Sequence, residues 1–277
     1  MTYSILLYRI LDLIGGVYLA IVITVTNQKG GIGKTTTATA LISGLTASGK
    51  KVLGIDLDPQ GNMGFSLGLE IEHCYTIYDV FKENVAITKA ISRTAYGDII
   101  PSNILLSGAE LEFNRHGREF LLRNALEDIG HLYDYIIVDT PPALNILTVN
   151  AYVASDCLII PMVAEILSLL GVSQLKETLD AVVKSHNKNL RILGILLTKF
   201  NKQLNLSKEV LEMSQTIAAQ LHTRVFDAKI RQGVAVAEAP AHCQSILEYA
   251  PKSKPALDYA DFIKEVLALT EIKKEGT

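Results

Sequence analysis

The stretch Asn27-Gln-Lys-Gly-Gly-Ile-Gly-Lys-Thr-Thr36 decides the fold. Its glycines leave backbone N–H groups free to point into a concavity ahead of a helix, which is a phosphate-binding arrangement. In such a loop Lys34 reaches the β- and γ-phosphates, and the Thr35 hydroxyl completes a Mg²⁺ shell. Gln28 stands where the usual pattern has a glycine, and Lys29 adds a second lysine at the loop entrance. The stretch therefore predicts a nucleotide site with one positive charge more than a single nucleotide needs.

The segments on both sides of the loop agree with this interpretation. Residues 20–26 are apolar and β-branched over the length of one strand, as expected for a buried parallel strand. Residues 36–47 place apolar side chains at helical spacing, and Gly49 is a suitable helix end. A strand, a glycine loop and a helix in this order indicate nucleotide binding by Gly30, Gly31, Ile32, Gly33, Lys34, Thr35 and Thr36, with Lys29.

The rest of the chain alternates strand-like and helix-like segments. Strands are expected at 51–56, 98–101, 135–139, 156–161, 191–198 and 224–226, and helices at 108–128, 170–185, 207–221 and 255–269. Apolar runs separated by helices predict an α/β fold: one doubly wound, mostly parallel, twisted sheet with helices on both faces. Ligands of such sheets bind beyond the carboxyl ends of the strands.

Two acidic segments follow strands at those ends. Asp56 and Asp58 end the strand at 51–56, before the turn Pro59-Gln-Gly-Asn62. Asp58, further into the loop, is predicted to orient the attacking water, and Asp56 to support the loop or the metal shell. Asp139 ends the run Tyr135–Asp139 and is predicted to contact Mg²⁺ directly or through water. Strand-end capping is the structural alternative for both segments.

Composition narrows the class of protein. At 277 residues and 49% hydrophobic content, the chain can bury one large core without a second domain. Its three cysteines lie far apart and show no paired metal-ligand spacing, which favours isolated thiols in a reducing cytosol. The net charge of −3 indicates no general affinity for nucleic acid. Residues 184–232, however, carry nine basic and three acidic side chains. This segment either forms a phosphate-backbone surface or is an ordinary solvated one.

The first nineteen residues are mostly apolar and carry only Arg9 and Asp12 as charges. Because residues 20–26 are needed as a strand, the remainder is too short for the roughly 20 residues of a membrane span. No small-residue cleavage signature precedes the strand. Two alternatives stay open: a helix docked on the body, a partner or a membrane surface, or a start codon upstream of the working protein.

Three motifs in register resemble the ParA/Soj family, the partition ATPases of the deviant Walker-A superfamily that includes MinD. They are Lys29-Gly-Gly-Ile-Gly-Lys-Thr-Thr36, Asp56-Leu-Asp-Pro-Gln-Gly-Asn62 and Asp139-Thr-Pro-Pro142. Shorter matches lie at Pro101–Asn103, Leu106–Leu111, Leu147–Ala151 and Glu238–Pro240. The similarity runs from about residue 20 to about residue 268. The expected organisation is an N-terminal extension at 1–19, an ATPase domain at 20–270 and a tail at 271–277.

The resemblance implies a nucleotide switch. ATP, with Mg²⁺, would join two protomers face to face, with Lys29 of each reaching the nucleotide of the other. The ATP-bound homodimer would bind DNA nonspecifically, and a ParB-like centromere-binding protein would stimulate hydrolysis and release it. Lys34 and Thr35 would hold phosphate and Mg²⁺, and Asp58 the attacking water. The expected location is the cytoplasm, on the nucleoid.

One segment departs from the family pattern. The family usually has Ile-Pro-Arg-Asn where this chain has Ile230-Arg-Gln-Gly233. In the family the Pro and Asn clasp adenine and the Arg touches DNA. Arg231, one position earlier, is the candidate replacement, so Arg231 and Gly233 are assigned to the cofactor site. The expected DNA contacts are Lys199, Lys202, Arg224 and Arg231.

Two other functions compete with partition. A MinD-like regulator that cycles on membranes would need a basic amphipathic helix at its C-terminus. Residues 262–274 carry both signs of charge and resemble a packing helix instead. A small-molecule kinase would need an acceptor pocket and no Lys29. A DNA-segregation ATPase is therefore the leading interpretation, and a membrane partner is not expected.

Overall fold

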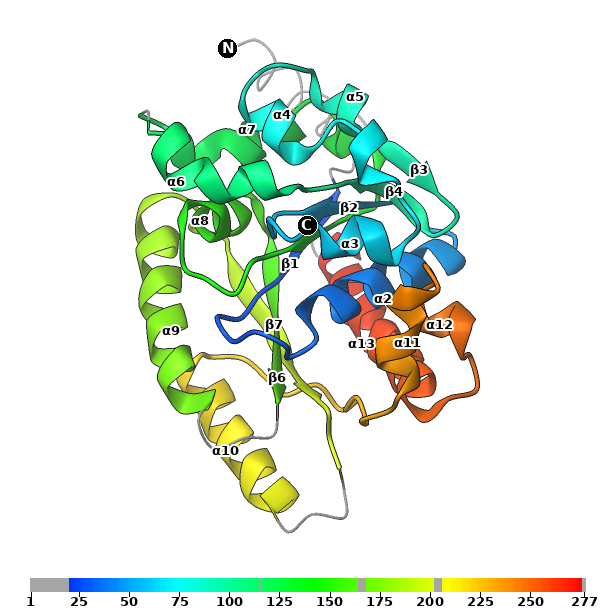
Figure 1. Cartoon of the computed structure of the whole chain (residues 1–277). Helices are drawn as coiled ribbons and strands as arrows, with labels where there is room; N and C mark the ends of the chain where they lie inside the picture. The colour runs from blue at the N-terminus through cyan, green and yellow to red at the C-terminus, as the bar shows by residue number, and fades with distance from the viewer. Residues whose placement is uncertain (1–19, 115, 164–167, 202–205, 276–277) are drawn as a thin grey trace.

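The computed structural model describes residues 20–114, 116–163, 168–201 and 206–275, and its centre is one sheet of seven strands (Figure 1). The strands are β1 (Ile21–Val25), β2 (Val52–Asp56), β3 (Ser92–Thr94), β4 (Gly97–Ile100), β5 (Tyr135–Asp139), β6 (Cys157–Val163) and β7 (Arg191–Thr198). Their order is β3-β4-β2-β5-β1-β6-β7, and only β3 with β4 pairs antiparallel. The predicted fold class is confirmed.

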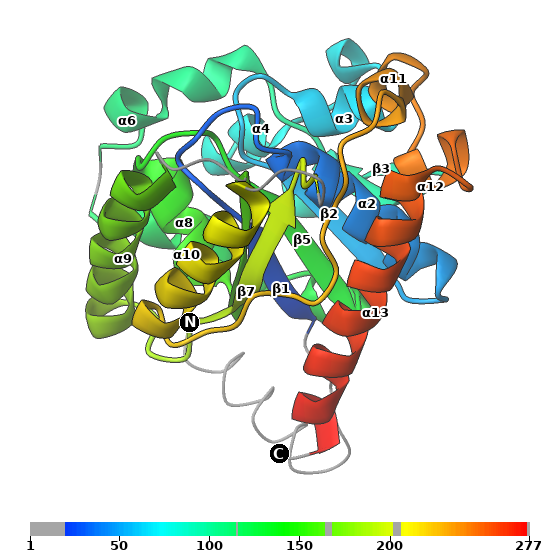
Figure 2. The ribbon, with the colours of Figure 1, turned by 90° about the horizontal axis from the view of Figure 1, so that it is seen from below.

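Helices cover both faces of the sheet (Figures 1 and 2). On one face lie α4 (Ile77–Phe81), α7 (Leu121–Leu126), α8 (Ile146–Ala154), α9 (Ser168–Ser185) and α10 (Leu206–Gln220). On the other lie α2 (Lys34–Ala47), α3 (Asn62–Ser66), α11 (Ala235–Ala241), α12 (Ile246–Tyr249) and α13 (Lys254–Glu275). Two short helices, α5 (Ile87–Ala90) and α6 (Ala109–Glu112), complete the connections.

The core has two halves because successive strand side chains point to opposite faces. Strand β5 shows this directly. Ile136 and Val138 belong to the cluster under α8 and α9, whereas Tyr135 and Ile137 belong to the cluster under α2 and α13. All five β5 residues are buried, which explains why the strand has no polar alternation.

The predicted strands β5 and β7 have the bounds that the structure shows. The long helix expected at 108–128 is wrong. The segment forms α6, a 3-10 turn at Arg118–Phe120 and α7, and Gly117 adopts φ 82°, which a continuing helix excludes. The strand expected at 224–226 is a single bridge between Val225 and Ile195. Helix α13 continues past 269 to Glu275, and residues 1–19 lie outside the described part of the chain.

The place of β5 determines the site. β5 lies between β1 and β2. Asp139, the last residue of β5, is paired with Val25 of β1 on one side and with Asp56 of β2 on the other. All three strands are parallel, so their carboxyl ends meet at one edge of the sheet. The glycine loop after β1 and the acids that end β2 and β5 are thereby brought together.

Candidate functional site

The glycine loop between β1 and α2 has the backbone shape that its sequence predicts. Gly31 and Gly33 have φ values of 69° and 90°, in the left-handed region that glycine adopts without strain. Gly33 caps α2, which begins at Lys34. The first amides of a helix have no partner within the helix, so those of Lys34 and Thr35 are available to an anion at this end.

Two hydrogen bonds attach this loop to the sheet, and a third lies behind it. The Asn27 side-chain amide donates to the Pro161 carbonyl at 2.8 Å, and the Thr198 hydroxyl donates to the Ile32 carbonyl at 2.8 Å. Behind the loop, the Thr140 hydroxyl donates to the Val25 carbonyl at 3.0 Å. Because Pro161 belongs to β6 and Thr198 ends β7, the loop is held by the sheet before any ligand arrives.

Lys34 is folded back into the loop. Its ammonium donates to the Lys29 carbonyl at 3.0 Å, and the residue is only 7% exposed. Burial lowers the pKa of Lys34, and the negative charges of Asp139 and Asp58 oppose that change. The ammonium therefore feels the charge of two carboxylates, and a phosphate could serve as a further partner.

Thr35 and Asp139 form the feature most suited to a metal ion. The Thr35 hydroxyl donates to Asp139 Oδ2 at 2.6 Å, while Asp139 Oδ1 is buried without a hydrogen-bond partner among the described residues. Burial raises the pKa of Asp139 to about 7, although the Thr35 hydroxyl and the charge of Lys34 act in the opposite direction. A buried carboxylate oxygen with no partner is costly, and a divalent cation would satisfy it.

Asp56 and Asp58 have different surroundings. Both oxygens of Asp56 accept backbone N–H groups, from Asp58 at 2.9 Å and from Met63 at 3.0 Å. Full burial raises the pKa of Asp56, and the nearby Asp139 charge adds to the increase. Asp58 Oδ1 accepts the Gln60 N–H at 3.0 Å, and its side chain lines the cavity described next. The geometry thus gives Asp56 a loop-supporting position and Asp58 a position facing the ligand space.

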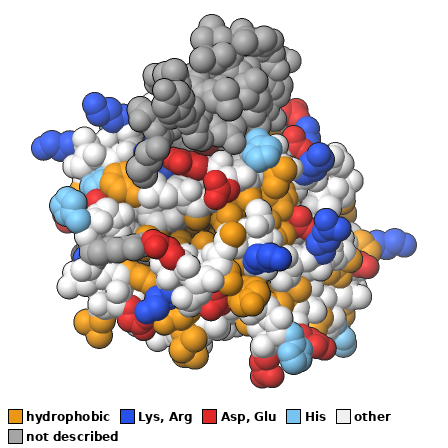
Figure 3. All heavy atoms as spheres, turned by 90° about the horizontal axis from the view of Figure 1, so that it is seen from above, with side chains coloured by type: hydrophobic (Ala, Val, Ile, Leu, Met, Phe, Trp, Pro, Cys, Tyr) orange, Lys and Arg blue, Asp and Glu red, His pale blue; other side chains and the backbone are white. Residues whose placement is uncertain are grey.

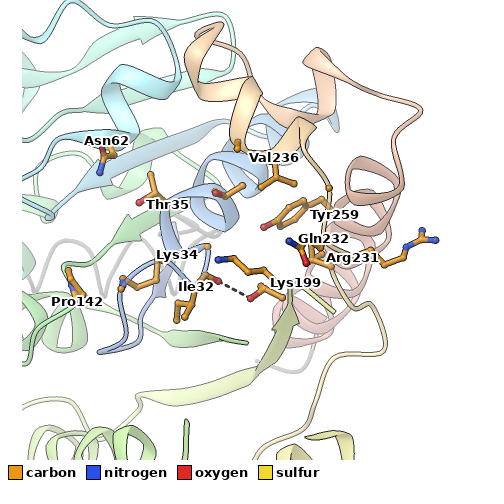
Figure 4. Close-up of a pocket in the computed structure, with 18 of the residues that line it drawn as sticks. Ile32, Lys34, Thr35, Asn62, Pro142, Lys199, Arg231, Gln232, Val236 and Tyr259 are labelled. Carbon is orange, nitrogen blue, oxygen red and sulfur yellow. Dashed lines mark hydrogen bonds between the residues drawn. The ribbon is translucent and has the colours of Figure 1, made fainter. Parts of the chain in front are cut away.

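A cavity of about 510 Å³ opens in front of the loop. The predicted residues that line it are Gly30, Gly31, Ile32, Gly33, Lys34, Thr35, Thr36, Asp58, Arg231 and Gly233, and Lys199 joins them. Figure 4 shows Ile32, Lys34 and Thr35 on one side of the cavity and Gln232, Val236 and Tyr259 on the other. One end can therefore hold phosphates, and the other can hold the remainder of a nucleotide.

Sequence reasoning did not assign Thr198 or Tyr259 to this cavity. Thr198 ends β7, so the rule on carboxyl strand ends could have found it. Tyr259 lies inside α13, and its hydroxyl is 3.3 Å from the Thr37 hydroxyl of α2. Burial raises the pKa of Tyr259 to about 12. An aromatic residue in an amphipathic helix gives no signal that separates this role from core packing.

Three of the four expected DNA contacts, Lys199, Arg224 and Arg231, lie in the described residues. Lys199 and Arg231 line the cavity, and the Arg231 side chain points away from the loop (Figure 4). Arg224 is exposed before the Val225 bridge, and Lys202 lies outside the described residues. On the face seen in Figure 3, the basic and acidic side chains drawn in colour are interspersed. The DNA contacts therefore remain a prediction.

No helix in the described ranges combines the length and apolar character that crossing a membrane requires.

Comparison with known proteins places this chain in a recognised family. A family model described as an AAA domain matches residues 20–192. The chain is 41% identical to the sporulation initiation inhibitor protein Soj of Bacillus subtilis, over 89% of this chain and 98% of Soj. It is 37% identical to the chromosome partitioning protein ParA of Myxococcus xanthus, over 89% of this chain and 87% of ParA.

A solved structure shares the fold. It is that of cobyrinic acid a,c-diamide synthase from Mycobacterium smegmatis with a bound ATP analogue and magnesium. The TM-score is 0.80 at 33% sequence identity, and the match covers 90% of this chain and 94% of the other.

Proposed function

Because the chain belongs to the ParA/Soj family of partition ATPases, we propose that it hydrolyses ATP to drive the segregation of plasmid or chromosomal DNA. The observation that carries the proposal is the arrangement at the loop. The start of α2, Lys34 and Thr35 line one edge of the cavity, and the Thr35 hydroxyl is hydrogen-bonded to the buried Asp139 behind it. This arrangement suits a nucleotide triphosphate with its cation.

Nucleotide and metal would be held by different residues. Residues 30–36 would bind the phosphates, and Thr35 and Asp139 would hold Mg²⁺, which supplies charge neutralisation for phosphoryl transfer. Asp56, with both oxygens already bonded to backbone, would act on the shape of the 56–62 loop. Asp58 would orient the attacking water, because its carboxylate faces the cavity and accepts a single backbone N–H from Gln60.

The remaining steps of the cycle are carried over from the ParA/Soj family. The ATP-bound homodimer would bind nonspecific DNA, and a ParB-like centromere-binding protein would stimulate hydrolysis and so release it. Turnover by the protein alone would be weak. Lys29 fits a role in the partner subunit, because its side chain is not among those that line the cavity of its own protomer. A MinD-like cycle on membranes is the alternative.

Retention on DNA tests the proposal. We expect the protein to be retained on nonspecific duplex DNA with Mg²⁺ and ATP, and not with ADP or without nucleotide. A phosphate-backbone contact weakens steeply with salt, so retention should fall by at least about tenfold between 50 and 200 mM salt. Measurement by surface-immobilised DNA gives both results. ATP-dependent binding to anionic vesicles without DNA retention would favour the MinD-like cycle and reject partition.

The same measurement separates partition from small-molecule chemistry. The Mycobacterium smegmatis protein is described as a synthase, and it has the same fold. A fold shared between different activities does not decide between them. ATP hydrolysis that responds to DNA and to a centromere-binding partner would support partition, whereas hydrolysis that responds only to a small acceptor would contradict it.

Asp139→Asn tests the metal assignment. We expect the Mg²⁺ concentration for half-maximal ATP hydrolysis to rise about 10- to 100-fold, because the neutral amide is a weaker cation ligand. The fold should be no less stable, since burial already disfavours the Asp139 charge. Mg²⁺ titration and thermal unfolding measure the two effects. Asp134→Asn, before the other end of β5, is the matched control, and an unchanged Mg²⁺ requirement in Asp139→Asn would refute the assignment.

A further inference from the structure

Arg231 is bound by one carboxylate through both its side chain and its backbone. Arg231 Nε donates to Asp258 Oδ2 at 2.8 Å, and a terminal guanidinium nitrogen donates to Asp258 Oδ1 at 2.6 Å. The backbone N–H of Arg231 donates to Asp258 Oδ2 at 2.9 Å. The two side chains are 37% and 13% exposed, so the pair is partly shielded from water. A bidentate, charge-assisted contact of this kind fixes orientation as well as distance.

The pair joins two elements that form one wall of the cavity. Residues 230–233 line the cavity, and so does Tyr259, which follows Asp258 in α13. On the sheet side the same segment is attached to β7, because Ile230 N–H donates to the Leu197 carbonyl at 2.8 Å. The segment is thus held between β7 and the first turns of α13.

The approach of the segment to α13 is close. A Cβ added to Gly233 would lie 2.7 Å from Pro255 Cγ, which is shorter than side chains tolerate. Glycine at 233 therefore allows the segment to contact the start of α13. The Arg231–Asp258 pair holds the same segment about one turn further along the helix. The phosphates belong at the opposite end of the cavity, at residues 30–36. The base and ribose must then extend toward this wall.

We propose that Arg231 and Asp258 are positioning residues whose ion pair holds residues 230–233 as the base-side wall of the nucleotide cavity. The inference rests on the proposed nucleotide binding and adds the part played by α13, which the sequence comparison does not assign. It gives Arg231 a role inside the protomer in place of the expected contact with DNA. The guanidinium is already bound by Asp258, and it points away from the phosphate loop (Figure 4).

Nucleotide affinity is the quantity that the pair should control. We expect Arg231→Gln and Asp258→Asn each to weaken binding of a fluorescent ATP analogue with Mg²⁺ by about tenfold, because each removes a charge-assisted contact and loosens the wall. The double variant should also lose about tenfold rather than a hundredfold, since the two residues act as one unit. At saturating ATP the hydrolysis rate and the DNA retention should match those of the wild type.

Two further variants make the test specific. Asp261→Asn is the matched control, because Asp261 lies on the same helix in an exposed pair with Lys264 at 2.8 Å. It should leave nucleotide affinity unchanged. Gly233→Ala should weaken nucleotide binding without altering a charge, since its Cβ would displace the segment from Pro255. Thermal unfolding of each variant shows that a loss of affinity is not a loss of fold.

The outcomes separate the inference from the proposed function. Unchanged nucleotide affinity in both single variants, with Arg231→Gln alone losing DNA retention at saturating ATP, would overturn the positioning role and assign Arg231 to DNA. If the losses of nucleotide affinity add up in the double variant, the two residues do not act as a pair, and the inference is also rejected. If the wild type binds ATP but no DNA, the proposed partition function is refuted. The nucleotide affinities of the Arg231 and Asp258 variants still test the inference in that case. A wild type that binds no nucleotide would refute both.

Discussion

Replacing Asp58 with alanine is expected to lower the rate of ATP hydrolysis by about 10²- to 10⁴-fold, the range typical of a lost general acid–base or water-orienting group. ATP binding should remain within a fewfold of wild type, because the phosphate loop and the Thr35–Asp139 pair are untouched. The variant should therefore accumulate in its ATP-bound state and stay on DNA. Single-turnover hydrolysis and direct nucleotide binding measure the two effects separately.

A nearby acid gives the control for this result. Glu72 lies in the exposed 3-10 turn at Ile71–His73, shortly after the same loop, and Glu72→Ala should hydrolyse ATP normally. Normal turnover in Asp58→Ala would show that another group orients the water. Loss of ATP binding together with hydrolysis would show instead that Asp58 supports the loop, as Asp56 does through its two backbone contacts.

Replacing Lys29 with alanine is expected to lower partner-stimulated hydrolysis by about 10³-fold or more, by analogy with a charged group supplied in trans to a phosphoryl-transfer site. ATP binding to the isolated protomer should be nearly unchanged, because the substitution keeps the backbone contacts of Lys29 within the loop. Its carbonyl accepts from Lys34 and its N–H donates to Asn27. Lys82→Ala, which breaks an exposed pair with Glu112, is the control.

Mixing the two inactive variants tests the trans assignment directly. In a dimer of one Lys29→Ala and one Asp58→Ala protomer, one site lacks both groups, whereas the other keeps its own Asp58 and receives Lys29 from its neighbour. Equal mixing before ATP is added should thus restore roughly a quarter of wild-type turnover, as random two-fold pairing predicts. If Lys29 acted on its own protomer's nucleotide, every site would stay inactive and mixing would restore nothing.

The parts of the fold that could be predicted are those where a local pattern has one physical solution. The run Tyr135–Asp139 is apolar throughout, and only a buried strand accommodates it. The glycines at 31 and 33 require a loop with positive φ, which the structure has. By contrast, β3 is the short polar segment Ser92–Thr94, and its pairing depends on Gly97–Ile100 rather than on its own composition.

The site was predictable at its phosphate end and much less at its base end. Lys34, Thr35 and Asp139 follow from motifs at strand ends, and the strand register brings them together. Asp258 could not be identified, because its partner lies 27 residues earlier and the contact depends on how α13 packs. A charged residue on an amphipathic helix is ordinarily solvated, so sequence alone favours that interpretation.

The position of β5 also bears on how the protein is made. β1 and β2 each pair with β5 in place of pairing with each other, although the phosphate loop and α2 connect them. A growing chain that has just completed β2 therefore has two strands separated by a vacant position. The acceptor of the Thr35 hydroxyl, Asp139, is added to the chain only 104 residues later. Nucleotide can then bind and stabilise only chains whose sheet is complete. Bound nucleotide is therefore also a sign that the chain has folded.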